Sequence, residues 1–416
     1  MSIKVRYIYS ACVLIETIDL KILCDPWVSE GAYDGSWYHY PPMKNPLETI
    51  GPADFIYISH IHPDHYDPRF LKVYLGKYPS AKVLIAPFSN NILSKKMDRN
   101  GIAHEIESNI SIGKTNIWVV PNERVWHDVD SAIIVQHDGH SVVNMNDNIY
   151  NEGQIKKIKN VVPKIDIALL AYAGAGPYPQ TYYEVGPELI KKANQKKEQF
   201  FERYKKMRDA LDPQISIPFA GKYLLGGNLY YLNPFRGVPD AVEVTRFDKN
   251  AVVLDDGGKA WIDTQNLQPS SIREQSYSEE EMSAYALKLS HQPMDYMLKY
   301  HELDLSAIPF EEILQKAYEN GIKWTRNDKD HWFCINLPEQ WFVMNSNSEN
   351  TSCHEKRDVS DIFPRTEIYV DLRYLYGLLN GEYHWSIAEV GSQLLMRRFP
   401  DTYDEKVQNF LNFLHI

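Results

Sequence analysis

The sequence has few cysteines, no long apolar run and no excess of positive charge, and each absence excludes a class of protein. The four cysteines are scattered and include no Cys-x-x-Cys pair, so neither a disulfide framework nor a cysteine zinc site is indicated. No apolar stretch approaches the roughly 18 residues of a membrane span, and the amino terminus lacks the apolar core of a signal peptide. We therefore expect a cytoplasmic protein without a membrane span.

The overall charge of the chain limits its partners. The formal net charge is −11, so no basic excess exists to neutralise the phosphates of a nucleic acid. We therefore expect a small-molecule substrate and no nucleic-acid partner. An acidic substrate would require a local positive pocket.

The most informative feature that is present is a dense group of imidazole and carboxylate side chains. His60, His62, Asp64 and His65 directly follow an apolar run at residues 55–58, which predicts a buried strand. Because alternate residues of an extended backbone project to one side, His60 and His62 can bind one metal ion. Pro63, which lies between His62 and Asp64, redirects the chain. Asp64 and His65 could therefore hold a second ion or position a water.

A further carboxylate, Asp147, follows the apolar segment 142–146, which predicts another strand. A carboxylate at the end of a sheet can bridge two cations, each of which favours its ionised form. We therefore predict that Asp147 is a bridging ligand.

The pattern His60-x-His62-x-Asp64-His65 resembles the zinc-binding signature of the metallo-β-lactamase superfamily. The resemblance implies an α/β fold, a four-layer αββα sandwich with the active site at one edge of its two sheets. It also implies that His127 is the third ligand of the first metal. Asp25 stands where the superfamily has a structural aspartate near the metal loop, although a turn before Pro26 would explain it equally well.

The superfamily normally takes one more histidine for its second metal from a late strand. The matching stretch, residues 217–228, contains none. Asn228 could substitute weakly through its amide oxygen and is otherwise a candidate substrate contact, or Asp64 and His65 complete the second position with water. The predicted cofactor is therefore one or two divalent ions, zinc or iron.

Six further motifs resemble the β-lactamase-like region of the CMP-N-acetylneuraminic acid hydroxylases. They are Asp25-Pro26-Trp27, Gly35-Ser36-Trp37, Pro41-Pro42, Asp128-Val129-Asp130-Ser131, Tyr172 to Pro179, and Pro218-Phe219-Ala220-Gly221. Those hydroxylases also carry a Rieske domain, and its Cys-x-His and Cys-x-x-His ligands do not occur in this sequence. We therefore expect no Rieske cluster in this chain, so oxygen chemistry would need a separate electron donor.

Candidate substrate contacts lie on loops. The aromatic loop that contains Trp37 and His39 either caps a core edge or lines a ligand groove. The glycine-rich loop that contains Tyr178 allows a phosphate or sugar to approach the backbone closely, and a plain turn is the alternative. Lys222 follows an apolar strand end and is a candidate anion contact.

Two parts of the chain differ in character. We predict a metal-binding catalytic domain over residues 1–245 and an α+β extension without recognisable chemistry over residues 246–416. Within the first part, the charged residues 183–210 predict a solvent-facing helix rather than a binding arm.

Three functions are compatible with these features. The first is a metal-dependent hydrolase, acting on a nucleotide sugar or another phosphate-bearing small molecule, in which Asp64 orients or deprotonates a metal-activated water. The second is a non-haem iron oxygenase with one or two irons, related to the CMP-N-acetylneuraminic acid hydroxylases. The third is a non-catalytic metal-binding protein.

Overall fold

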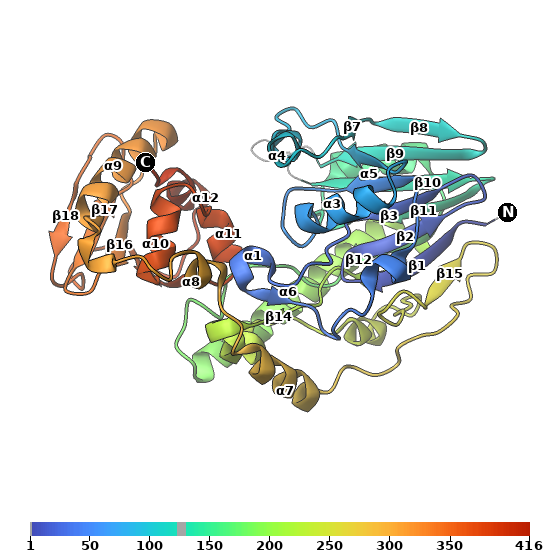
Figure 1. Ribbon diagram of the computed structural model, residues 1–416. Helices are drawn as coiled ribbons and strands as arrows, with labels where there is room; N and C mark the ends of the chain where they lie inside the picture. Colours follow the sequence, from blue (N-terminus) through green and yellow to red (C-terminus); the bar gives the residue numbers. More distant parts are fainter. Residues whose placement is uncertain (1, 123–129) are drawn as a thin grey trace.

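A computed structural model describes residues 2–122 and 130–416 of the chain. Within these ranges, the amino-terminal part contains a seven-stranded and a six-stranded sheet (Figure 1). The order of the first is β15 (Trp261–Asp263), β1 (Lys4–Tyr9), β2 (Cys12–Glu16), β3 (Lys21–Cys24), β5 (Phe55–Ile58), β6 (Lys82–Ile85) and β7 (Glu105–Ile106). The order of the second is β13 (Pro213–Phe219), β12 (Ile165–Ala171), β11 (His140–Asn144), β10 (Ser131–His137), β9 (Thr115–Pro121) and β8 (Asn109–Ile112).

The two sheets pack face to face. One hydrophobic core combines inward side chains of both, such as Val13 and Tyr57 from the first sheet and Ile133 and Ile167 from the second. Helices α3 (Pro68–Lys77) and α4 (Ile92–Asn100) cover the outer face of the first sheet, and α5 (Glu152–Val161) and α6 (Pro187–Leu211) cover that of the second. The predicted αββα sandwich is therefore confirmed.

Local sequence explains the central elements. All four residues of β5 are buried, as expected for a strand that pairs in parallel on both sides and is covered on both faces. Helix α3 begins where the Asp67 side chain accepts a hydrogen bond from the backbone N–H of Phe70 at 3.0 Å, with a proline in the first turn.

The carboxy-terminal part has its own five-stranded sheet. Its order is β18 (Cys353–Lys356), β17 (Trp341–Asn345), β16 (Trp332–Asn336), β19 (Arg365–Tyr369) and β20 (Leu395–Phe399). Helices α9 (Phe310–Thr325), α10 (Leu372–Leu379) and α11 (Trp385–Val390) share a core with this sheet. The remaining elements are α1 (Ala32–Gly35), β4 (Trp37–Tyr38), α2 (Pro46–Ile50), β14 (Leu224–Leu225), α7 (Glu279–Leu289), α8 (Asp295–Lys299), α12 (Glu405–Gln408) and 3-10 helices η1 (Gly227–Phe235), η2 (Ala241–Arg246), η3 (Leu305–Ala307) and η4 (Leu411–Phe413).

The carboxy-terminal core also contains the aromatic loop of the amino-terminal part. Trp27, Tyr33 and Trp37 are buried in the same cluster as Phe333 and Leu375. Strand β15 lies beyond residue 245 and still pairs with β1, which favours a boundary later than the predicted one. The division at residue 245 stays a prediction.

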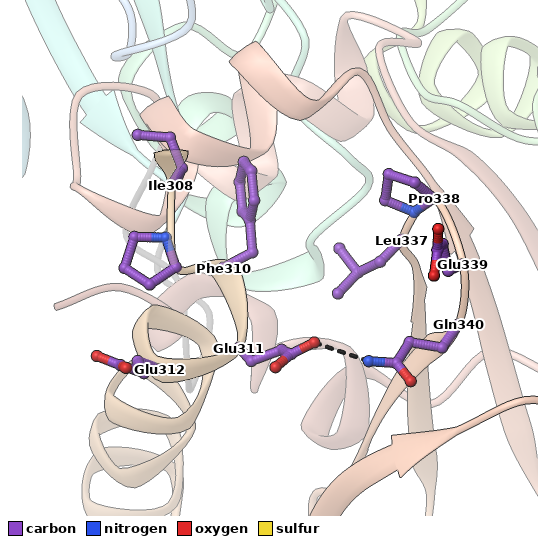
Figure 2. A pocket seen from close by; sticks show the side chains of 9 residues that line it. Ile308, Phe310, Glu311, Glu312, Leu337, Pro338, Glu339 and Gln340 are labelled. Atoms are coloured by element: carbon purple, nitrogen blue, oxygen red, sulfur yellow. Dashed lines mark hydrogen bonds between the residues drawn. The ribbon is translucent and has the colours of Figure 1, made fainter. Parts of the chain in front are cut away.

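A cavity of about 340 Å³ lies in the carboxy-terminal part, between the start of α9 and the turn that joins β16 to β17 (Figure 2). Across it, the Gln340 side-chain amide donates a hydrogen bond to Glu311 at 2.7 Å. Its lining includes no histidine or cysteine, so it offers no metal site of the predicted kind. Within the described ranges, no helix is both long enough and apolar enough to cross a membrane.

We expect Gly35→Ala to weaken the packing between the two parts. Gly35 has φ +95°, and an added Cβ would lie 2.9 Å from the backbone nitrogen of Asp295 and 3.0 Å from the Cα of Met294. The free energy of unfolding, measured in urea, should fall by about 2–4 kcal/mol. Gly101→Ala is the control, because Gly101 has φ +68° with no atom within 4 Å of an added Cβ. Equal losses in the two variants would contradict the proposed close contact.

Candidate metal centre

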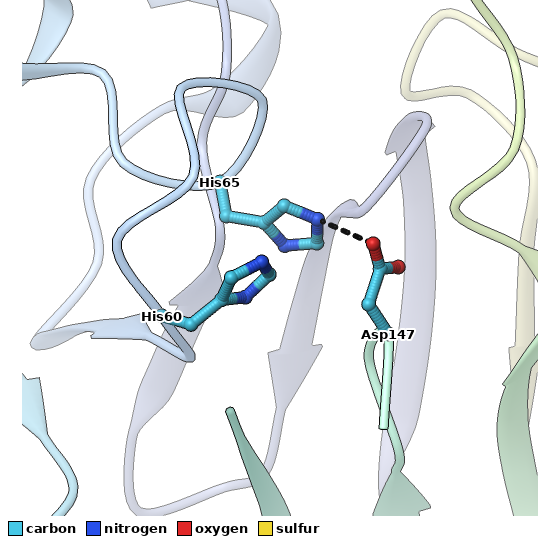
Figure 3. A group of neighbouring side chains, drawn as sticks. All are labelled: His60, His65 and Asp147. Carbon is cyan, nitrogen blue, oxygen red and sulfur yellow. Dashed lines mark ion pairs between the residues drawn. The ribbon is translucent and has the colours of Figure 1, made fainter. Parts of the chain in front are cut away.

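The predicted ligands come from two loops that follow parallel-paired strands. His60, His62, Asp64 and His65 follow β5, and Asp147 follows β11 in the other sheet. Ligand atoms of His60, His65 and Asp147 lie within 4.8 Å of one another, and their side chains point toward one another (Figure 3). The sandwich therefore brings together residues that are more than eighty positions apart.

His60 and His62 form a pair. The Nε2 atom of His60 lies 2.8 Å from the Nδ1 atom of His62, so one cation could contact both rings. On the other side of the His60 ring, Nδ1 lies 2.9 Å from the Ser59 hydroxyl and 3.5 Å from Oδ1 of Asp130. A carboxylate behind a histidine fixes the ring orientation and leaves the opposite nitrogen for a metal.

His65 is held between three carboxylates. Its Nδ1 lies 2.8 Å from Oδ2 of Asp25, while its Nε2 faces Oδ2 of Asp64 at 3.5 Å and Oδ2 of Asp147 at 3.4 Å. Asp25 is fully buried with φ 42°, and it also accepts hydrogen bonds from the backbone and hydroxyl of Ser59. Of the two explanations that the sequence leaves open for Asp25, the structure favours the role at the metal loop.

Asp64 is oriented from outside the motif. The Tyr33 hydroxyl donates a hydrogen bond to its Oδ1 at 2.6 Å, which leaves Oδ2 directed at His65. Tyr33 and Asp130 are contacts that the sequence does not assign to the site. Asp130 stands in a motif of the family resemblance, whereas Tyr33 has no local signal because it approaches Asp64 only through the tertiary fold.

The electrostatics of the cluster follow from burial and close charges. Burial lowers the pKa of His60 well below its ordinary value, and the neighbouring His65 and His62 lower it further. Burial also lowers the pKa of His65, but the carboxylates of Asp64, Asp147 and Asp25 overcome this effect and raise it well above its ordinary value. Burial raises the pKa of Asp64, and the nearby Asp147 carboxylate adds to the increase.

These atoms fit a cation. The Oδ1 atom of Asp147 is buried and has no hydrogen-bond partner among the described residues, and the buried Nε2 atom of His65 has only its ion-pair contacts with Asp64 and Asp147. Unpartnered buried polar atoms are unfavourable unless a ligand satisfies them. Imidazole nitrogens and carboxylate oxygens suit zinc or iron, and the identity of the metal stays a prediction. His127, the predicted third ligand of the first metal, lies outside the described residues.

A cavity of about 650 Å³ opens beside these side chains. His60, His62, Asp130 and Asp147 line one side of it. Its volume lies in the range of small-molecule sites. The metal cluster is therefore next to a space that a substrate can enter.

The five predicted substrate contacts are not among the residues that line this cavity. Trp37 is buried and stacks on Tyr223 with ring centroids 3.3 Å apart, and His39 is buried and stacks on Trp27 at 4.1 Å. Of the two explanations that the sequence leaves open for the aromatic loop, this burial favours a core edge, and the substrate roles of Trp37 and His39 stay predictions.

The other three predicted contacts lie elsewhere. Tyr178 lines a separate cavity of about 360 Å³, and Asn228 is exposed on η1. Lys222 is paired with Asp240 at 3.4 Å, and burial lowers its pKa to about 8. These roles in substrate binding stay predictions.

We expect Asp25→Asn to weaken metal binding by about 10–100-fold, because an amide no longer holds His65 Nδ1 as a carboxylate does. The measurement is competition for metal with a chromophoric chelator. Asp166→Asn is a matched control, since Asp166 is also buried and lies 3.5 Å from a histidine, His140, outside the cluster. Unchanged affinity in a folded Asp25 variant would refute the role of Asp25.

Comparison with solved structures finds chains of limited similarity. CmlA, a diiron β-hydroxylase from Streptomyces venezuelae, is 18% identical with a TM-score of 0.42, over 63% of this chain and 53% of that chain. Igni18, a metallo hydrolase from Ignicoccus hospitalis, is 16% identical with a TM-score of 0.40, over 63% of this chain and 98% of that chain.

Comparison of the amino-acid sequence with known proteins identifies a family and individual relatives. Residues 4–174 match the family described as the β-lactamase superfamily domain. The chain is 26% identical over 239 residues to the inactive cytidine monophosphate-N-acetylneuraminic acid hydroxylase of Homo sapiens, which covers 53% of this chain and 45% of that protein. The hydroxylase of Pan troglodytes is also 26% identical over 239 residues, covering 53% of this chain and 38% of that protein. The chain thus spans less than half the length of these curated relatives. Residues 4–174 therefore form a domain of the β-lactamase superfamily, homologous to part of the cytidine monophosphate-N-acetylneuraminic acid hydroxylases.

Proposed function

We propose that this protein is a metal-dependent hydrolase of a small molecule. Its metal centre would be formed by His60, His62, Asp64, His65 and Asp147, with His127 as a further ligand. The observation that carries the proposal is the convergence of His60, His65 and Asp147 within 4.8 Å, with a buried oxygen of Asp147, Oδ1, that has no hydrogen-bond partner among the described residues. A bound cation would satisfy that oxygen.

The side chains around the centre have separable tasks. A bound cation would supply Lewis acidity and lower the pKa of water at the site. Asp25 and Asp130 hold the rings of His65 and His60 through their Nδ1 atoms, at 2.8 and 3.5 Å. Asp64 faces the centre through Oδ2 while Tyr33 fixes Oδ1, so Oδ2 is placed to orient the attacking water and accept its proton.

The substrate that we propose is a nucleotide sugar or another phosphate-bearing small molecule. The cavity of about 650 Å³ is large enough for such a ligand. The sequence relation to cytidine monophosphate-N-acetylneuraminic acid hydroxylases supports this class of substrate.

An iron-dependent oxygenase is the second candidate. The observation that favours it is the 26% identity to the hydroxylases over 53% of this chain. The nitrogen and oxygen ligands of the candidate metal centre also suit non-haem iron. An oxygenase of this kind would take its electrons from a separate donor. Two measurements distinguish the hydrolase from the oxygenase: elemental analysis of protein purified in air and anaerobically, and uptake of dioxygen. Zinc without dioxygen uptake favours hydrolysis. Iron with substrate-dependent dioxygen uptake favours oxygenation.

We expect the double substitution His60→Ala and His62→Ala to abolish both bound metal and activity. The two imidazoles, 2.8 Å apart, supply two ligands to the same cation. Metal content is measured by elemental analysis. The control is His301→Ala with His354→Ala, two exposed histidines outside the site. Retained stoichiometric metal in the first variant would rule out this centre.

Asp64→Asn should leave most of the metal in place and lower turnover by about 10²–10⁴-fold, because an amide cannot accept the proton of the attacking water. Turnover and metal content are measured on the same preparation. Full activity with full metal would exclude Asp64 as the base.

A further inference from the structure

The side of the cavity formed by α6 carries positive charge. Phe200, Arg203, Lys206 and Met207 line the cavity from this helix. Residues three, four and seven positions apart share one helix face, so these side chains form a continuous wall. The sequence predicts a solvent-facing helix here, but the face with Phe200 and Met207 is buried.

The two cations on this wall contact aromatic rings. Within residues 2–122 and 130–416, no carboxylate forms an ion pair with Arg203 or Lys206. The Arg203 guanidinium lies 5.8 Å from the centre of the Phe200 ring. The Lys206 ammonium lies 3.9 Å from the centre of the Tyr150 ring, which also lines the cavity.

Two more cations, Lys196 and Arg236, form no ion pair with any carboxylate of the described residues. Lys196 is one turn before Phe200 on the same helix face, only 9% exposed, and its Nζ has no hydrogen-bond partner in the part of the chain that the structure describes. Arg236 is 6% exposed; it donates through Nη2 to the Tyr223 carbonyl at 2.8 Å, and its Nε and Nη1 are unpartnered in the same described part.

Arg236 is placed beside Lys196 by a close backbone contact. The next residue, Gly237, approaches α6 so tightly that an added Cβ would overlap the carbonyl oxygen of Ala193. Burial lowers the pKa of Lys196 to about 7, and the charges of Arg236 and Arg203 contribute to the decrease. Neighbouring buried cations repel one another, so an anion bound in the adjacent cavity would offset part of this repulsion.

Other parts of the cavity lining come from the loop after β12 and from the metal side. Ala173, Gly174 and Ala175 of the loop after β12 line the same cavity, and Gly174 is so close to Phe200 that an added Cβ would lie 3.1 Å from its ring. Of the carboxylates that line the cavity, Asp130 and Asp147 belong to the metal side, and Glu405 comes from the carboxy-terminal part. Metal ligands and α6 cations therefore face one shared space.

We propose that Arg203 and Lys206, supported by Lys196 and Arg236, bind an anionic group of the substrate, a phosphate or a carboxylate, while the reacting bond lies at the metal side. This inference rests on the proposed function in taking the cavity as the substrate site. The net charge of the whole chain is −11, so this cation group does not reflect a generally basic surface.

The test measures binding of inorganic phosphate and of acetate to the metal-loaded full chain by titration calorimetry. Native protein is compared with the double variant Arg203→Gln and Lys206→Gln. Loss of two charge-assisted contacts should weaken anion binding by about tenfold or more and reduce its dependence on salt concentration. The control double variant, Lys191→Gln and Arg246→Gln, removes the same charge from two exposed positions that do not line the cavity.

The control should bind the anions as native protein does. Equal affinity in both double variants, or no binding of either anion to native protein, overturns the proposal. Tighter binding of phosphate assigns a phosphate group to the substrate, and tighter binding of acetate assigns a carboxylate.

The same titration on the His60→Ala and His62→Ala variant separates this inference from the proposed function. Anion binding should persist there and should still depend on Arg203 and Lys206. If that metal-site variant keeps its metal, the hydrolase proposal fails while the anion site stands. If the His60→Ala and His62→Ala variant loses anion binding while the Arg203→Gln and Lys206→Gln variant retains it, the proposed anion site is wrong.

Discussion

The ion pair between Asp25 and His65 is the interaction on which the rest of the site depends. Asp25 is fully buried at the end of β3, in a backbone conformation with φ 42°, and it holds both Ser59 and Nδ1 of His65. It therefore links the first sheet to the metal loop and directs Nε2 of His65 toward Asp64 and Asp147. Without that constraint the ring could rotate, and the two loops would no longer share a common centre.

Groups of opposite charge line one cavity: Asp130 and Asp147 beside the candidate metal centre, and Arg203 and Lys206 on α6. A low-dielectric cavity strengthens the interaction of each group with a ligand of opposite charge. The substrate that we propose, with its anionic end and its reacting end separated, would meet a different partner at each end.

The carboxy-terminal part contributes to this space. Val390 and Glu405 line the cavity together with residues of the β-lactamase superfamily domain. Its core also surrounds Trp27, Tyr33 and Trp37, and Tyr33 in turn orients Asp64. Residues that follow the sandwich in sequence thus support a side chain at the metal centre.

The sequence alone indicated the strands before the site, through their apolar runs, and the group from His60 to His65, because ligand spacing within one loop is local. The sandwich itself was implied by the resemblance of that group to the metallo-β-lactamase superfamily. It also indicated Asp147, since a carboxylate at a strand end is visible without a structure. Tertiary structure decided the remainder. Only the tertiary structure shows that Trp37 and His39 are buried at a core edge and that Tyr33 contacts Asp64. It also favours the role of Asp25 at the metal loop over a role in the turn alone. It also brought Arg203 and Lys206 to the cavity that His60 and Asp147 line. Each of these contacts joins residues far apart in the chain, and only packing of the two sheets, α6 and the carboxy-terminal part fixes the distances between them.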